Sequence, residues 1–111
     1  MIRKFKISEE ELEFKMTNKT VIDIDEIYDN YGTVINGILF GENIYNNAFK
    51  LVSASCISRK LTFEELVENL TPDQISEKIV NFAFDLYADW RGIKETSIDE
   101  EDKENNDKKK A

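Results

Sequence analysis

The sequence contains no histidine and only one cysteine, Cys56, among its 111 residues. Without an imidazole, the chain cannot form a Ser-His-Asp triad, a histidine-ligated metal site or a histidine acid–base pair. A single cysteine cannot close an internal disulfide or form a Cys-x-x-Cys metal cluster. The sequence also lacks a P-loop, a Gly-x-Gly-x-x-Gly fingerprint and a nucleophile elbow. We therefore expect a protein that is not an enzyme and that has no catalytic, metal or cofactor site.

Long apolar runs and positive charge are also scarce. No stretch approaches the roughly 20 apolar residues of a membrane span, and the N-terminus lacks the apolar block of a signal peptide. The chain has 15 basic and 23 acidic residues, a formal net charge of -8, whereas proteins that follow nucleic-acid phosphates need dense Lys and Arg. We expect no membrane contact, no nucleic-acid partner and a cytoplasmic location.

The hydrophobic residues, 41% of the chain, are unevenly distributed. Residues 1–92 hold nearly all of them, together with 16 acids and 10 bases, whereas residues 93–111 hold seven acids and five lysines. So polar a segment cannot bury enough apolar surface to offset the entropy lost on ordering. The composition predicts one domain over 1–92 and a disordered, charged tail over 93–111.

Residues 4–16 alternate between apolar and polar side chains, the period of a half-buried strand. The pattern predicts a short β-hairpin that turns at Ser8-Glu9-Glu10. The apolar positions are Phe5, Ile7, Leu12, Phe14 and Met16.

From Thr20 the apolar spacing changes to three and four residues, which indicates an amphipathic helix. Asp23 followed by Glu26 suggests an N-cap, so we expect a helix from there to about residue 30. Gly32 and Gly37 then interrupt the pattern, which predicts a second short helix near 33–40. The β-branched run 33–35 leaves a strand as the alternative.

The second half of the chain contains clearer helix signals. A stripe over 43–58 predicts a helix that includes Cys56 as a small buried hydrophobe. Thr62-Phe63-Glu64-Glu65 is a capping box with a Leu61/Leu66 staple, and Thr71-Pro72-Asp73-Gln74 repeats the box with proline at the first helical position. The last helix is expected to run to Arg91, with Gly92 as its C-terminal cap. The predicted fold is mainly α: a compact helical domain of about four to five helices with a short N-terminal β-hairpin.

The expected last helix has an unusually wide apolar surface. Its core face comprises Ile75, Ile79, Phe82, Leu86 and Trp90. Val80, Phe84 and Tyr87 extend the apolar arc to roughly 200°, against about 100° for an ordinary surface helix. Either the helix is central and flanked by others, or these three residues form a protein-interaction surface.

Paired carboxylates are frequent in so acidic a chain. Asp85 and Asp89, four residues apart on the expected helix, could face a cation, but two carboxylates alone make a weak site. We interpret them, together with Asp23/Asp25 and Glu64/Glu65, as solvated faces.

The order of these elements resembles the tail assembly chaperones of long-tailed bacteriophages and prophages. The resemblance covers most of residues 1–92: the hairpin at 4–16, the helix near 23–30, the stretch 43–58, the segment Leu-Thr-Phe-Glu-Glu-Leu that opens 61–70, and 72–92. A charged tail then closes the chain.

The resemblance implies a non-catalytic protein of the bacterial host cytoplasm that is not retained in the mature virion. Such a protein binds the tape measure protein, recruits tail tube subunits during tail assembly and possesses a surface for its client or for self-association. The family also often has a longer form made by ribosomal frameshifting, and the lysine run 108–110 is compatible with a slippery site.

Two other functions fit the composition. The charge of -8 suits a small acidic regulator or inhibitor that binds a basic partner protein. A structural virion adaptor is the other alternative, and it would persist in purified particles.

Overall fold

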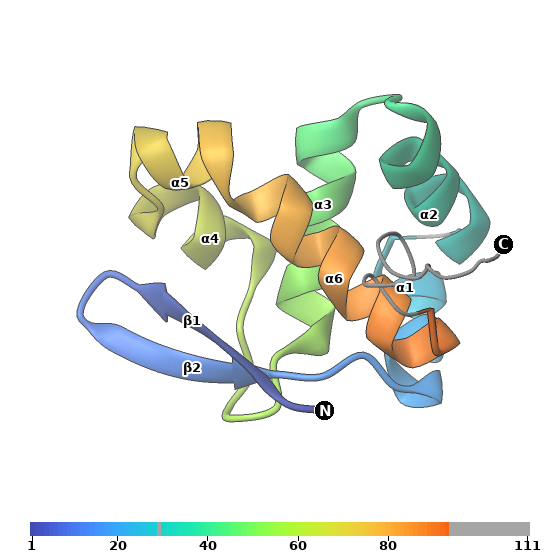
Figure 1. Ribbon diagram of the computed structural model, residues 1–111, viewed down its shortest axis with the longest axis horizontal. Helices are drawn as coiled ribbons and strands as arrows, with labels where there is room; N and C mark the ends of the chain where they lie inside the picture. Colours follow the sequence, from blue (N-terminus) through green and yellow to red (C-terminus); the bar gives the residue numbers. More distant parts are fainter. Residues whose placement is uncertain (29, 94–111) are drawn as a thin grey trace, which may run out of the picture.

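The computed structural model describes residues 1–28 and 30–93, and within them a two-stranded hairpin is followed by six helices (Figure 1). The predicted mainly helical fold with an N-terminal hairpin is confirmed. Except for Ile93, the tail expected over 93–111 lies outside the described residues. The elements are β1 (Arg3–Ile7), β2 (Glu10–Phe14), α1 (Asn18–Tyr28), α2 (Tyr31–Phe40), α3 (Ile44–Ser55), α4 (Phe63–Asn69), α5 (Pro72–Glu77) and α6 (Ile79–Arg91).

Helix α3 is the centre of the core. It packs against α1, α2, α4 and α6, and Figure 1 shows α6 crossing its face. Ala48, Leu51 and Val52 on α3 are completely buried. Because apolar side chains lie around most of this helix, its neighbours can pack on several of its sides.

The hairpin forms as the alternation predicts. β1 and β2 pair antiparallel with Phe5 opposite Leu12, and the turn residue Ser8 takes a positive φ of 58°. The apolar face points inward: Phe14 is completely buried, and its ring meets the Phe82 ring edge-on at 5.3 Å between centroids. The hairpin is therefore attached to α6 by aromatic packing.

Strand β2 also binds the segment that leaves α3. The Lys15 amide donates to the Ser55 carbonyl and the Ile57 amide donates to the Glu13 carbonyl, both at 2.9 Å. This short backbone pairing holds residues 56–60 beside the hairpin and away from α1.

The first helix begins earlier than the sequence suggested. Helix α1 starts at Asn18, where the Thr17 amide donates to Thr20 Oγ1 at 3.0 Å. The predicted Asp23 cap is wrong, because Asp23 lies inside the helix and accepts hydrogen bonds from Lys19, one turn earlier. The sequence signal at this helix start is weak, because Thr17-Asn18-Lys19-Thr20 lacks the Glu or Gln that completes a capping box.

Gly32 and Gly37 lie within α2 and do not interrupt it. The helix is capped by Asn30, whose side chain accepts from the Thr33 amide at 3.0 Å. The strand alternative for 33–35 is also wrong, because Val34 and Ile35 are buried on the inner face of a helix. Tertiary packing overrides the weak local preference of β-branched residues here.

Both capping boxes predicted from the sequence are present. Thr62 exchanges hydrogen bonds with Glu65, and Thr71 exchanges hydrogen bonds with Gln74. Leu66 is fully buried, as expected of the hydrophobic staple.

The single helix predicted over 72–91 is wrong, because a break at Lys78 divides it into α5 and α6. Lys78 has φ -124° and ψ -38°, outside helical geometry. The two parts have different partners: Gln74 of α5 donates to the Lys6 carbonyl of β1 at 2.7 Å, whereas α6 packs on α3 and α2. The C-terminal cap at Gly92 is confirmed, with φ 77°. None of the described helices is both long and apolar enough to cross a membrane.

Candidate functional site

The core face expected on the last helix is mostly buried. Ile79, Phe82 and Leu86 lie in the core, as predicted. Ile75 and Trp90 are half-buried, and the Trp90 indole N–H donates to Asn18 Oδ1 at 2.9 Å. Trp90 thus attaches the end of α6 to the start of α1.

The three residues predicted as an interaction surface differ in their exposure to solvent. Phe84 is 44% exposed, whereas Val80 is half-buried against the core. Tyr87 is only 7% exposed, and its hydroxyl accepts a hydrogen bond from Arg91 at 2.7 Å. Tyr87 is therefore a core residue in this fold, and of the three only Phe84 presents a large apolar area to solvent.

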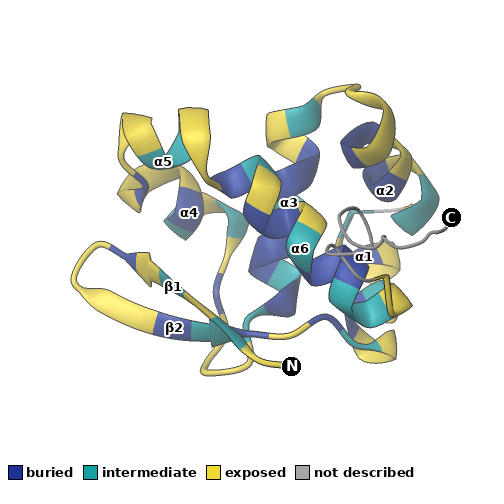
Figure 2. Cartoon of the chain, in the orientation of Figure 1, coloured by how far each residue is buried: buried dark blue, intermediate teal, exposed yellow. Residues whose placement is uncertain are grey.

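A second exposed apolar region, which the apolar spacing in the sequence did not predict, lies where α2 turns into α3. Phe40 at the end of α2 is 76% exposed, and Leu39 and Tyr45 are also exposed. Figure 2 shows exposed residues at the turn between α2 and α3. We call Leu39, Phe40 and Tyr45 the apolar corner. A sequence signal existed, because Gly41 ends the helix directly after Phe40 and so places that ring at a turn.

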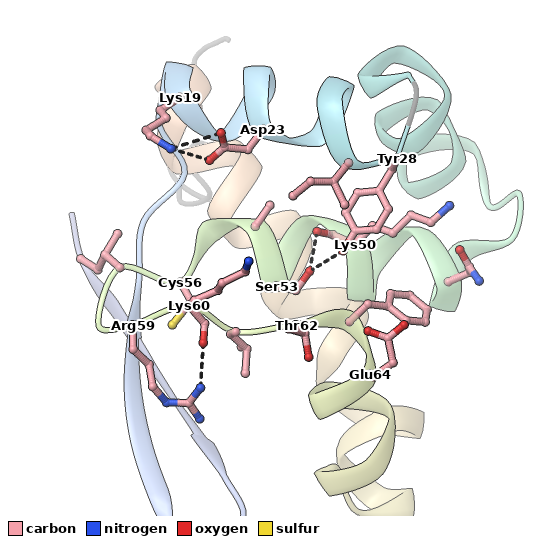
Figure 3. Close-up of a pocket in the computed structure, with 16 residues that line it drawn as sticks. Lys19, Asp23, Tyr28, Lys50, Ser53, Cys56, Arg59, Lys60, Thr62 and Glu64 are labelled. Atoms are coloured by element: carbon pink, nitrogen blue, oxygen red, sulfur yellow. Dashed lines mark hydrogen bonds and ion pairs between the residues drawn. The ribbon is translucent and has the colours of Figure 1, made fainter.

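A groove of about 890 Å³ lies over the outer face of α3. Figure 3 shows α1 on one side of α3 and the segment after α3 on the other. Ile27 of α1 is 62% exposed and Ile57 of the opposite wall is 48% exposed. The groove is lined by Lys19, Asp23, Ile27, Tyr28, Asn46, Lys50, Ser53, Ala54, Cys56, Ile57, Arg59, Lys60, Leu61, Thr62, Phe63 and Glu64.

Two of the four cations in the groove are already neutralised. Lys19 binds Asp23 at 2.9 Å, and this contact raises the pKa of the Lys19 ammonium. Arg59 binds Glu10 at 2.9 Å and Glu65 at 3.1 Å. Hydrogen bonds from the guanidinium lower the pKa of both carboxyl groups.

The other two cations, Lys50 and Lys60, form no ion pair with any residue the structure describes. The Lys50 ammonium lies over the Tyr28 ring, 5.4 Å from its centroid. Tyr28 is itself held by a 3.1 Å hydrogen bond between its hydroxyl and Ser53 Oγ. The α1–α3 contact therefore positions a free positive charge in a concave, partly apolar surface.

The carboxylates considered as a cation site have a structural partner. The Arg3 guanidinium binds Asp89 through two hydrogen bonds of 2.6 and 3.1 Å and lies 3.7 Å from Asp85. This contact attaches β1 to α6. In the part of the chain that is described, no three potential metal ligands gather.

Cys56 differs from its predicted environment. It is the C-cap that follows α3 and is half-buried at the groove, instead of lying inside the helical stripe. The helix ends one residue before it because the backbone there turns to pair with β2.

Comparisons with protein-family models, curated protein sequences and solved structures found no match to this chain.

Proposed function

We propose that this protein is a non-catalytic tail assembly chaperone of a long-tailed bacteriophage or prophage. In the host cytoplasm it would bind the tape measure protein, keep that long helical client soluble and recruit tail tube subunits. It would leave before the virion matures. The sequence resemblance suggests this role, and the exposed apolar corner is the observation that supports it.

The apolar corner has the chemistry of a protein-binding surface. Phe40 and Tyr45 expose aromatic rings within six residues of chain, and Leu39 adds an aliphatic side chain. Aromatic residues are enriched in the buried centres of protein interfaces, because a rigid ring loses little entropy while it buries a large area. We propose the corner, with Phe84 of α6, as the contact for the client or for a second copy of the chain.

The acidic surface suits the same role. Residues 1–92 carry 16 acids and 10 bases. Several copies bound along one client would repel the copies on neighbouring complexes, which opposes aggregation. Charge would thus act on solubility, while apolar contacts would provide affinity.

The direct test is co-expression with a tape measure protein, which the proposal expects to be encoded beside this chain. We expect the client to become soluble and to co-purify with the wild-type protein. Phe40→Ser and Phe84→Ser should each reduce recovery of the complex severalfold, because each removes an exposed aromatic contact. Circular dichroism should remain unchanged, since neither ring is part of the buried core.

Ile22→Ser and Val67→Ser are the matched controls. Both residues are as exposed as Phe84 or more so, and they lie on other elements, so both variants should retain the complex. A client that stays insoluble with the wild-type protein would refute the proposed function. Equal losses in all four variants would instead refute the corner as its site.

A further inference from the structure

We infer that the groove over α3 is a second protein-binding site, which receives an acidic segment of a partner protein carrying at least one large apolar side chain. This site lies beyond the proposed chaperone role, because the groove is formed by α1, α3 and residues 56–64 and not by the apolar corner. It also does not depend on that role, since the same chemistry would bind an acidic segment of any partner.

Charge complementarity indicates that the partner segment is negatively charged. Lys50 and Lys60 are two cations without a carboxylate partner among the described residues, and Glu64 is the one lining acid to which no ion pair is assigned. The rest of residues 1–92 has a strong excess of acids. An acidic segment is therefore attracted to the groove and repelled by most of the surrounding surface, which gives the site its selectivity.

The exposed apolar side chains in the groove indicate that the partner segment also carries an apolar residue. Ile27 and Ile57 face the groove from opposite walls and are both about half exposed or more. These isoleucines are exposed to water on two sides of one concavity. A partner that covers them would remove apolar surface from water, which lowers the free energy of the complex. A purely acidic polymer would leave them exposed, so the partner needs an apolar side chain between its carboxylates.

The groove is held open by contacts that do not involve a ligand. The backbone pairing of Ile57 with Glu13 fixes one wall, and the Tyr28–Ser53 hydrogen bond fixes the other wall against α3. Arg59 further anchors the first wall to β2 and α4 through Glu10 and Glu65. A preformed site loses less entropy on binding than a site that must fold around its ligand.

The length of the groove indicates how long a bound segment can be. The floor runs along α3 from Asn46 to Cys56, about 15 Å at the helical rise. About ten residues of a helix, or four to five residues of an extended chain, cover that distance. These lengths are typical of short recognition segments bound in a groove.

The test uses the full-length protein and a displayed library of random peptides about 16 residues long, which covers the floor in either conformation. We expect the enriched peptides to be net acidic and to contain at least one large apolar residue. One enriched peptide is then synthesised with a fluorophore, and its dissociation constant is measured by anisotropy at low and high salt. Binding should weaken as salt rises, because the contacts are charged.

Two sets of variants locate the site. The double variant K50E/K60E should bind about tenfold more weakly or worse, because two attractions become repulsions. The control K15E/K78E changes the net charge equally at two exposed lysines outside the groove, and it should bind as the wild type does. Ile27→Ser should also weaken binding, whereas Ile22→Ser, on the same helix but outside the groove, should not.

Three results would overturn the inference: no enrichment of any peptide, enriched peptides without an acidic bias, or equal affinity for K50E/K60E and its control. A mixed-sequence oligonucleotide that binds in the same assay and is lost in K50E/K60E, when no acidic peptide binds, would also overturn it. Because the probe is not the tape measure protein, these outcomes are separate from those that test the chaperone role.

Discussion

At the scale of single residues, Gly37 shows how one position can determine the approach of two helices. A Cβ on Gly37 would lie 1.9 Å from Asn47 Nδ2 and 2.5 Å from the Glu42 carbonyl oxygen. Asn47 is buried and donates to that same carbonyl at 2.8 Å, so the turn between α2 and α3 is built around the missing side chain. The glycine that looked like a helix breaker is in fact the residue that lets α2 pack on α3.

We predict that Gly37→Ala destabilises the protein by about 2 kcal/mol, because the added methyl must displace a buried amide and a backbone carbonyl. Denaturant unfolding followed by circular dichroism measures this change. Gly32→Ala is the matched control in the same helix. Its Cβ would meet only the Asn30 side chain, at 3.1 Å, and the change should be smaller than about 1 kcal/mol. Equal effects at the two glycines would show that helix propensity, and not packing, sets the cost.

At the scale of elements, Arg59 connects three parts of the fold. Its guanidinium donates to Glu10 of β2, to Glu65 of α4 and to the carbonyl of Lys60. The pKa of each carboxyl group is lowered by its hydrogen bond to Arg59. A carboxyl group whose pKa is lower in the folded state stabilises that state above its unfolded pKa and loses this effect as the pH falls.

The expected consequence is a pH-dependent effect of Arg59→Ala. The variant should be less stable than wild type at neutral pH, and the difference should shrink as the pH falls below 4.5, the ordinary value for these carboxyls. Free energies of unfolding measured at several pH values provide the comparison. Lys60→Ala, which removes a neighbouring cation that pairs with no described carboxylate, should show no such convergence. A difference for Arg59→Ala that stays constant across pH would mean that the guanidinium acts through packing alone.

At the scale of the whole molecule, the buried core that the structure describes spans almost the full length of the described residues. It extends from Ile7 in β1 to Tyr87 and Ala88 in α6, and the Gly92 cap closes the last helix. The amide of Ile93 donates to the Ala88 carbonyl at 2.8 Å, which completes the helix end. All of these contacts join described residues.

A chain truncated after Ile93 should therefore fold. We expect its free energy of unfolding to agree with that of the full chain within about 0.5 kcal/mol, because the truncation removes none of the described core contacts. Chemical denaturation of both proteins under the same conditions checks this. A loss of several kcal/mol would show that the charged tail packs on the domain.

The sequence predicted side-chain exposure less well than the fold. Phe84, on the wide apolar arc of the last helix, is exposed, but Tyr87 belongs to the same arc and is buried. Periodicity gives only an angle around a helix axis, whereas exposure depends on which neighbours cover that angle. The groove was missed because its two walls, α1 and the segment after α3, come from distant parts of the chain, and no local pattern encodes how α1 packs on α3.

Local chemistry in the sequence determined the hairpin alternation, the two capping boxes and the glycine cap at Gly92, because each depends on residues only a few positions apart. Its missing histidines and single cysteine limited the available chemistry in the same direct way. Only the tertiary structure decided that α5 and α6 separate at Lys78, that Tyr87 is core and that Lys50 and Lys60, which pair with no described carboxylate, border one groove. Those features depend on contacts between distant segments, where packing energy exceeds the small local preferences that a sequence pattern can reveal.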